Sequence, residues 1–346
     1  MADDGGMVMI TVLAAAYNGK KYIRQQMDSI LAQSQEGILL VVSDDGSSDG
    51  TAELLEEYQK DWGGRMLGIR RLRSSGGAAA HFLELLKLMA ELQAGGEPQE
   101  WGWKLTEEER SWLWRAAQSS YFMLSDQDDV WLSHKASALL EKMREEEQAL
   151  PAGTPVLVHS DVSVVNENLE LISPSLFHYQ GINPARNRLP QLLVQNNVTG
   201  GAVMLNGAML PFLRKIPRIC LMHDAWLALT ACCFGRIAWV EEPLYLYRQH
   251  GTNTLGAEKG DSFGGILKRL KDGSEARENY RRMFGQAACM LELFPEELSK
   301  EQKQVLQAFS GLGKRSRLMK MFLILRWGFT KDTWQRTLGQ MLLIGE

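Results

Sequence analysis

Cysteine is scarce in this chain, and its few copies form no recognisable pattern. Among 346 residues there are only Cys220, Cys232, Cys233 and Cys289. No spacing among them matches a metal-ligand set, and the adjacent pair Cys232 and Cys233 lies in an apolar segment, where buried thiols are the default. We therefore expect a protein kept in a reducing compartment.

Long apolar runs are also missing. Residues 1–6 lack the basic start and apolar core of a signal peptide, and no stretch approaches the length of a membrane span. The longest apolar run near the end, 319–329, is interrupted by Lys320 and Arg326. We predict a cytoplasmic protein, with contact at the inner face of the cell membrane as an option that the basic final segment leaves open.

Neither sign of charge is in large excess. The formal net charge is −4, so nothing global suggests a nucleic-acid partner. Acidic residues predominate in 1–262 and basic residues in 263–346. The last segment reads as basic amphipathic helices, which either lie peripherally on anionic lipid or pack on the domain with a solvated charged face.

Apolar residues are plentiful, at 45% of the chain, and their order predicts an α/β fold. We expect buried strands at 7–14, 38–42, 66–72 and 121–124, separated by helices at about 23–31, 51–60 and 78–92. This alternation predicts a parallel sheet with right-handed crossovers. Ligands bind beyond the carboxyl ends of such strands. Tyr17, Asp45 and Asp126, each just past a strand end, should therefore converge on one crevice.

Residues 93–118 interrupt this alternation and look like an insertion. Thr106 and Glu109 form the pattern of a capping box. The segment also holds four of the ten tryptophans, at positions 101, 103, 112 and 114. Packing onto the main body is the favoured role, and contact with an acceptor or partner is the alternative.

The most informative stretch is 125–131, Ser-Asp-Gln-Asp-Asp-Val-Trp. Three carboxylates follow directly on a buried strand, and such a cluster is costly unless a cation joins it. A solvated acidic turn is one alternative and a calcium loop another. An EF-hand would need a glycine after the third ligand, where this chain has Val130 and Trp131.

Six short motifs follow one another along the chain. They are residues 16–19 (Ala-Tyr-Asn-Gly), 44–49 (Asp-Asp-Gly-Ser-Ser-Asp), 125–131, 197–201 (Asn-Val-Thr-Gly-Gly), 222–226 (Met-His-Asp-Ala-Trp) and 247–253 (Tyr-Arg-Gln-His-Gly-Thr-Asn). Their order resembles glycosyltransferase family 2, and the later motifs resemble its rhamnosyltransferase branch of cell-wall and O-antigen polysaccharide synthesis.

The resemblance implies the GT-A nucleotide-diphospho-sugar transferase fold, an α/β fold with a mostly parallel, Rossmann-like central sheet flanked by helices. It suggests a catalytic domain at 1–260 and a basic helical C-terminal extension at 261–346. It also implies a divalent cation, Mg²⁺ or Mn²⁺, held by Asp128 and His250, with Asp126 facing the ribose or the water shell of the metal.

In the same resemblance, Tyr17, Asn18 and Asp45 bind the donor, with Tyr17 and Asp45 at the nucleobase. Family members often carry Thr where this chain has Ala15. Residues 44–49 also suit a helix N-cap turn, and both roles are compatible. Gly200 and Gly201 match a glycine loop through which the backbone approaches donor and acceptor, although glycine is equally at home in an ordinary turn.

Asp224 matches the general base of the family. An inverting transferase needs one base beside the acceptor hydroxyl, and a single displacement then inverts the anomeric carbon. Here the pair is His223-Asp224, as in the rhamnosyl branch, where other members have Glu-Asp. The alternative is that Asp224 only caps a helix at 225–233.

The resemblance thus predicts an enzyme that moves L-rhamnose from dTDP-L-rhamnose to a saccharide acceptor, which is lipid-linked in this hypothesis. One alternative is the same reaction with a UDP-hexose donor, glucosyl or galactosyl. Another is a non-catalytic sugar-nucleotide-binding scaffold.

Overall fold

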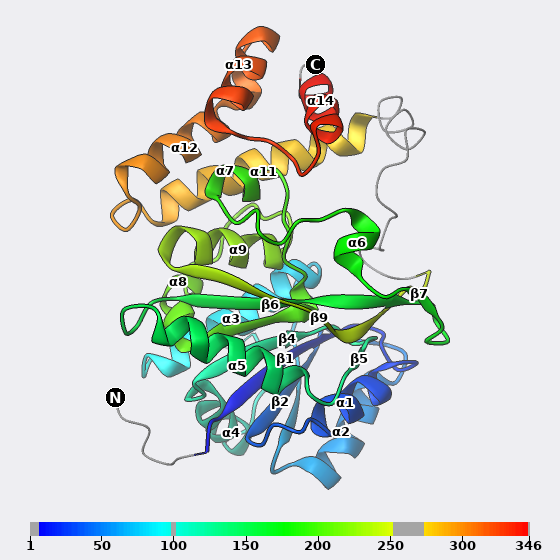
Figure 1. Ribbon diagram of the computed structural model, residues 1–346. Coiled ribbons are helices and arrows are strands. Elements are labelled where there is room, and N and C mark those ends of the chain that lie inside the picture. The colour runs from blue at the N-terminus through cyan, green and yellow to red at the C-terminus, as the bar shows by residue number, and fades with distance from the viewer. Residues whose placement is uncertain (1–6, 98–101, 252–272, 345–346) are drawn as a thin grey trace. The chain divides into compact units, whose positions relative to one another are not determined.

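The computed structural model describes residues 7–97, 102–251 and 273–344 (Figure 1). The chain forms two compact units that alternate along the sequence. Unit 1 comprises Met1–Ser175, Thr199–Ile216 and Ala238–Gly256, and unit 2 comprises Leu176–Val198, Pro217–Ile237 and Ala257–Glu346. The boundary that we predicted at 260/261 falls in 252–272, outside the described residues.

The described strands of unit 1 form one nine-stranded sheet in the order β3-β2-β1-β4-β8-β6-β9-β5, with β7 paired to β6. Their bounds are β1 Ile10–Ala16, β2 Ile38–Asp44, β3 Met66–Arg70, β4 Tyr121–Ser125, β5 Val130–Trp131, β6 Val156–Val165, β7 Leu171–Ser173, β8 Val203–Asn206 and β9 Arg236–Arg248.

The half of the sheet from β3 to β4 is parallel, as the alternating pattern predicts. β1 lies between β2 and β4, with Ala16 opposite Asp44 and Ala14 opposite Ser125. The three strands are almost entirely buried, which explains their unbroken apolar runs. Because they run in the same direction, their carboxyl ends meet at one edge of the sheet.

The other half of the sheet is antiparallel. β8 pairs antiparallel with both β4 and β6, and β5 pairs antiparallel with β9. β9 therefore ends beside β5, which begins immediately after the acidic cluster at 126–129. The sheet is mixed, and its antiparallel half returns the late part of the chain to the carboxyl edge of the parallel half.

Three helices of unit 1 agree closely with the predicted ranges: α1 Ile23–Leu31, α2 Thr51–Trp62 and α3 Ala78–Gln93. The unit also contains α4 Glu107–Ala117 in the insertion, and α5 Lys135–Gln148 and α8 Leu210–Leu213, for which no range was predicted. The α3 helix contacts β1, and α5 contacts β6. Buried aliphatic side chains of these helices and strands form the core of the unit.

The tryptophan-rich insertion packs onto unit 1. Trp103 is buried, and its Nε1 donates to Ser43 Oγ at 2.7 Å. Trp112 Nε1 donates to the carbonyl of Gly63 at 3.0 Å. The capping box predicted from Thr106 and Glu109 is present at the start of α4. The favoured interpretation, packing onto the main body, is therefore confirmed for these residues, while Trp101 lies outside the described part.

Unit 2 is mainly helical. Its helices are α6 Leu176–Gln180, α7 Leu189–Leu192, α9 His223–Phe234, α11 Gly273–Leu293, α12 Lys300–Ser310, α13 Arg317–Trp327 and α14 Trp334–Leu343. The α11 and α12 helices pack against each other (Figure 1). None of the helices in the described ranges is both long enough and apolar enough to cross a bilayer.

A histidine buried in β6 makes the stability of unit 1 depend on pH. Burial lowers the pKa of His159 to about 3, while the unfolded chain keeps an ordinary value near ~6.5. The unfolded state therefore binds one more proton than the folded state between these values. This contribution to stability is complete above pH ~6.5 and is lost as the pH falls towards about 3.

We predict that His159→Gln reduces the pH dependence of the unfolding free energy in this window by up to ~1.4 kcal/mol per pH unit. Urea unfolding at several pH values measures it. The exposed His178 provides the control variant His178→Gln. An unchanged slope in His159→Gln would contradict the assignment.

Candidate functional site

Loops from three adjacent parallel strands meet at the carboxyl edge of unit 1. Residues 17–22 follow β1, residues 45–50 follow β2, and residues 126–129 follow β4. The register of β1 with both neighbours brings these loops side by side. The predicted convergence of Tyr17, Asp45 and Asp126 on this edge follows from the observed topology.

Side chains of the loops hold them to one another. Asn18 accepts from the backbone N–H of Ser48 at 2.9 Å, and its own N–H donates to Ser47 Oγ at 2.8 Å. Gln127 accepts from the N–H of Tyr17 at 2.8 Å and donates to its carbonyl at 3.0 Å. The Tyr17 backbone is therefore fixed from both sides, while the residue remains 58% exposed.

The Asp45 carboxylate is buried and bound by its own chain. It accepts from Ser74 Oγ at 3.0 Å, from Ser75 N and Oγ at 2.7 and 2.9 Å, and pairs with Arg71 Nε at 3.1 Å. Four donors match the lone-pair positions of a carboxylate. A nucleobase N–H that binds Asp45 must therefore displace one of these partners.

The neighbouring carboxylates Asp44 and Asp49 support the turn between β2 and α2. Asp44 accepts from the backbone of Gly46 and Ser47 at 3.1–3.3 Å. Asp49 accepts from the backbone and hydroxyl of Thr51 at 3.0 and 2.6 Å. These bonds hold the turn before α2, but the N-cap position of α2 is Gly50 and receives no side-chain cap, so the N-cap role considered for residues 44–49 is not supported.

The acidic cluster meets the end of β9, more than a hundred residues later. His250 Nε2 lies 2.8 Å from Asp128 Oδ2, and the two side chains are only 7% and 13% exposed. The His250 ring stacks on Tyr22 with centroids 4.8 Å apart. The two residues proposed from the sequence to share a cation are therefore in direct contact.

Arg248 holds the contact between Asp128 and His250 in place by hydrogen bonds to three segments of the chain. Its Nε donates to the carbonyl of Asp128 at 2.7 Å, and its terminal nitrogens donate to the carbonyl of Glu167 and to Gln25 Oε1 at 2.7 and 2.6 Å. Its backbone N–H donates to Asp129 Oδ1 at 3.0 Å. One side chain thus connects the acidic cluster with α1 and the end of β6.

Burial and like charge act together on the acidic cluster. Burial raises the pKa of Asp129 well above its ordinary range, and the charges of Asp128 and Asp126 raise it further. Below the cluster, Lys135 is fully buried, with Nζ 3.6 Å from the centre of the Trp131 ring. Burial lowers the pKa of Lys135 well below its ordinary value, and the charges of Asp129 and Asp126 oppose this shift.

The glycine segment lies against the same cluster. Gly200 and Gly201 begin a short 3₁₀ helix, Gly200–Ala202, and both are buried. A Cβ added to Gly201 would lie 3.1 Å from the Tyr245 hydroxyl and 3.4 Å from Asp126 Oδ2. The Gly201 carbonyl accepts from Lys135 Nζ at 2.5 Å. A side chain at 201 would therefore make Tyr245 and Asp126 shift, and glycine avoids this crowding.

Asp224 belongs to unit 2, in the first turn of α9. This helix begins at His223, two residues earlier than the predicted range, and its N-cap position is Met222. Asp224 therefore does not occupy the N-cap, although its Oδ1 accepts from the N–H of Ala225 at 2.6 Å. The capping alternative is not supported, and the role of Asp224 as a base stays a prediction.

The donor atoms at Asp128 and His250 fit a divalent cation that is shared with a substrate. Among the described residues, no group of three or more His, Cys, Asp or Glu side chains is arranged to hold a metal. Mg²⁺ is typically bound by one or two carboxylates together with substrate phosphates and water. A carboxylate and an imidazole in contact, beside two further carboxylates, suit that mode of binding.

Comparisons with known proteins agree with this architecture. Residues 11–86 match the family "Glycosyl transferase family 2". The dTDP-rhamnosyl transferase RfbG of Shigella flexneri is 24% identical over 74% of this chain and 77% of its own length. The putative teichuronic acid biosynthesis glycosyltransferase TuaG of Bacillus subtilis is 26% identical over 40% of this chain and 42% of its own.

The match at 11–86 agrees with the resemblance to glycosyltransferase family 2 that the sequence motifs predict. Solved structures support the GT-A fold of this family. S. aureus TarS 1–349 in complex with UDP-GlcNAc superposes with a TM-score of 0.51 at 14% identity, covering 92% of this chain and 80% of TarS 1–349. GalNAc-T7 with UDP, GalNAc and Mn²⁺ gives 0.50 at 14%, covering 88% and 57%. The predicted fold class is confirmed.

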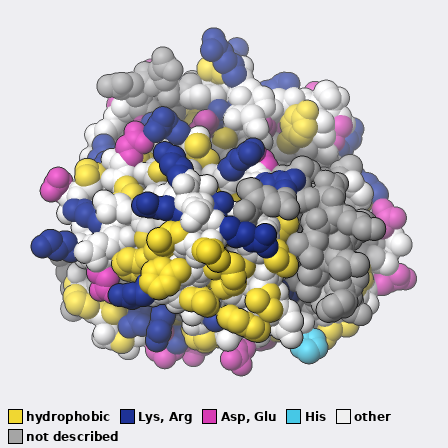
Figure 2. All heavy atoms as spheres, turned by 90° about the horizontal axis from the view of Figure 1, so that it is seen from above, with side chains coloured by type: hydrophobic (Ala, Val, Ile, Leu, Met, Phe, Trp, Pro, Cys, Tyr) yellow, Lys and Arg dark blue, Asp and Glu magenta, His cyan; other side chains and the backbone are white. Residues whose placement is uncertain are grey.

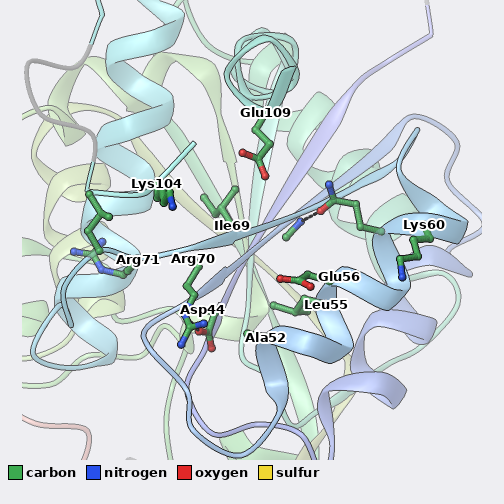
Figure 3. Close-up of a pocket in the computed structure, with 13 residues that line it drawn as sticks. Asp44, Ala52, Leu55, Glu56, Lys60, Ile69, Arg70, Arg71, Lys104 and Glu109 are labelled. Atoms are coloured by element: carbon green, nitrogen blue, oxygen red, sulfur yellow. Dashed lines mark hydrogen bonds and ion pairs between the residues drawn. The ribbon is translucent and has the colours of Figure 1, made fainter. Parts of the chain in front are cut away.

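Unit 1 also has a cavity of about 610 Å³ at the edge strand β3 (Figure 3). Leu55, Ala52 and Ile69 supply apolar surface, and charged side chains of both signs surround them. None of the predicted site residues lines this cavity. Its lining includes Asp44, next to the predicted Asp45, and Arg71, which pairs with Asp45. It therefore lies apart from the contact between Asp128 and His250.

Sequence reasoning assigned no role to Lys135, Arg248 or Gln127, although all three organise the site. A lone lysine at the start of a helix looks like a solvated side chain, because burial is not visible in the sequence. Arg248 stands inside a motif quoted for the family, two residues before His250. That proximity was the available signal.

We predict that Arg248→Lys destabilises the fold by about 2–4 kcal/mol. The planar guanidinium of arginine donates to three acceptors at once, and the single ammonium nitrogen of lysine cannot reach all three. Urea unfolding measures the change. Arg236→Lys, at the exposed opposite end of β9, is the control and should cost little. Equal stability of both variants would refute the anchoring role of Arg248.

Proposed function

We propose that this family 2 enzyme is an inverting, metal-dependent transferase that moves L-rhamnose from dTDP-L-rhamnose to a saccharide acceptor in surface polysaccharide synthesis. The observation that carries the proposal is the contact between Asp128 and His250 beside Asp126. Support for rhamnose comes from the similarity to RfbG, and support for polysaccharide synthesis from RfbG and TuaG.

In this proposal Asp128 and His250 hold a divalent cation, Mg²⁺ or Mn²⁺, which offsets the negative charge that develops on the leaving diphosphate. GalNAc-T7, which shares the fold, is described with Mn²⁺ and UDP. Asp126 faces the ribose or the metal's water shell. Arg248 keeps Asp128 in place through its backbone carbonyl.

The nucleotide occupies the loops that follow β1 and β2. The exposed Tyr17, whose backbone Gln127 fixes, offers a ring for the base. Asn18 holds the β1 loop to the β2 loop, and Asp45 accepts from the base by exchanging one of its present partners. Gly201 leaves room beside Asp126, where a side chain would intrude, and Gly200 precedes it in the same buried 3₁₀ helix.

Asp224 is the proposed general base. It removes the proton of the acceptor hydroxyl as that oxygen attacks the anomeric carbon opposite the diphosphate, so the configuration inverts. The acceptor in this hypothesis is a lipid-linked saccharide at the inner face of the cell membrane.

A donor panel tests the proposal. dTDP-L-rhamnose, UDP-glucose and UDP-galactose are compared for release of nucleoside diphosphate with Mn²⁺, with Mg²⁺ and with a chelator. We expect the highest rate with dTDP-L-rhamnose and loss of release with the chelator. A higher rate with a UDP-hexose would show that the proposed donor, dTDP-L-rhamnose, is wrong. No release of nucleoside diphosphate from any donor under any condition would refute catalysis.

The base is tested by Asp224→Asn. We predict that turnover falls by about 10²-fold or more, while donor affinity changes little, because the amide cannot accept the proton. Asp61→Asn, the same chemical change at an exposed position of α2, is the control. Unchanged turnover in Asp224→Asn would remove this residue from the mechanism.

A further inference from the structure

Two helices of unit 2 expose apolar side chains in an unusual concentration. Half of the large hydrophobic residues that are exposed in the described ranges lie on α13 and α14, at 43–80% exposure. They are Leu318, Met319, Phe322 and Leu325 on α13 and Trp334, Leu338 and Leu342 on α14. The spacing places each group on one face of its helix.

The inward faces of the same helices carry polar side chains that fix their orientation. Lys320 is buried, and its Nζ donates to the carbonyl of Ile344 at 2.6 Å. Gln340 is also buried, and its Nε2 donates to the carbonyl of Phe329 at 2.9 Å. Turning either helix to bury its apolar face would break these bonds. The exposed apolar face therefore follows from the packing of the unit.

Positive charge accompanies this apolar face. Lys314, Arg315, Arg317 and Arg326 are exposed. From 311 to 344 the only acidic residue is Asp332, which is paired with Arg186 and Arg336. Figure 2 shows hydrophobic side chains gathered together with Lys and Arg side chains around them. The apolar patch and the cations thus occupy the same face.

We propose that the outer faces of α13 and α14 form a docking surface for an anionic lipid bilayer. Lipid headgroups match the cations, and the acyl boundary receives the apolar side chains. Trp334 suits this position, because tryptophan is enriched where apolar and wet regions meet. A second copy of the chain fits less well, since it would bring two sets of cations together. The inference does not depend on the donor sugar or on catalysis.

Binding to vesicles tests this surface in the full chain. Flotation compares vesicles of phosphatidylcholine alone with vesicles in which about one third of the lipid is phosphatidylglycerol. We expect at least ~10-fold stronger partition into the anionic vesicles, decreasing with added salt. Equal binding to both vesicle types, or none to either, would overturn the proposal.

Paired variants locate the surface. Leu318→Ser/Phe322→Ser should lower partition by roughly 10-fold, since two side chains no longer enter the acyl boundary. Leu171→Ser/Ile172→Ser removes two exposed apolar side chains from β7 of unit 1 and should leave binding unchanged. Circular dichroism verifies that both variants are folded. Equal loss in both pairs would contradict the location.

Charge is tested in the same way. Arg315→Gln/Arg317→Gln should weaken binding to anionic vesicles, by roughly 5-fold or more, whereas Lys300→Gln/Lys303→Gln on α12 should not. Sedimentation of the protein without vesicles measures whether a second copy of the chain occupies this surface instead. A dimer that Leu318→Ser/Phe322→Ser abolishes, together with vesicle binding that the same variant retains, would show that the patch joins two copies and would refute the bilayer.

Discussion

The crowding of three carboxylates at 126–129, of which Asp129 is buried and Asp126 and Asp128 are partly buried, is the constraint on which the rest of unit 1 depends. Clustered negative charges are tolerated out of water only when donors or cations surround them. Here Arg248 and His250 come from the far end of β9 to supply these contacts. The antiparallel half of the sheet is the means by which that distant segment reaches the carboxyl edge of the parallel half.

Most polar side chains in the loops at the carboxyl edge of the parallel strands bind other parts of the chain. Asp44, Asp49 and Asn18 are used to hold loop against loop, and Asp45 is bound by the serines and the arginine that follow β3. Tyr17 stays exposed, as its proposed contact with the nucleobase requires. A rigid frame of this kind suits an enzyme that must position a diphosphate before the bond breaks.

In α13 and α14 of unit 2, polar and apolar side chains are arranged in the opposite way to an ordinary surface helix, which buries its apolar face. In α13 and α14, lysine and glutamine point inward and make backbone bonds, while leucine, phenylalanine and tryptophan point outward. For a transferase whose proposed acceptor is lipid-linked, such a surface would keep the protein where its acceptor is found. Proposed catalysis in one part and proposed attachment in another are separable by mutation.

The sequence by itself determined the α/β class, the early strands within a few residues, and the ordered motifs that indicate glycosyltransferase family 2. These features are local, because apolar periodicity and short motifs are written along the chain. The resemblance also brought Asp128 and His250 together at one cation. Only the tertiary structure decided that Lys135 is buried, that donors of its own chain already surround Asp45, and that α13 faces outward with its leucines. Each of these depends on which segments pack together, and packing between distant segments leaves no local pattern in the sequence.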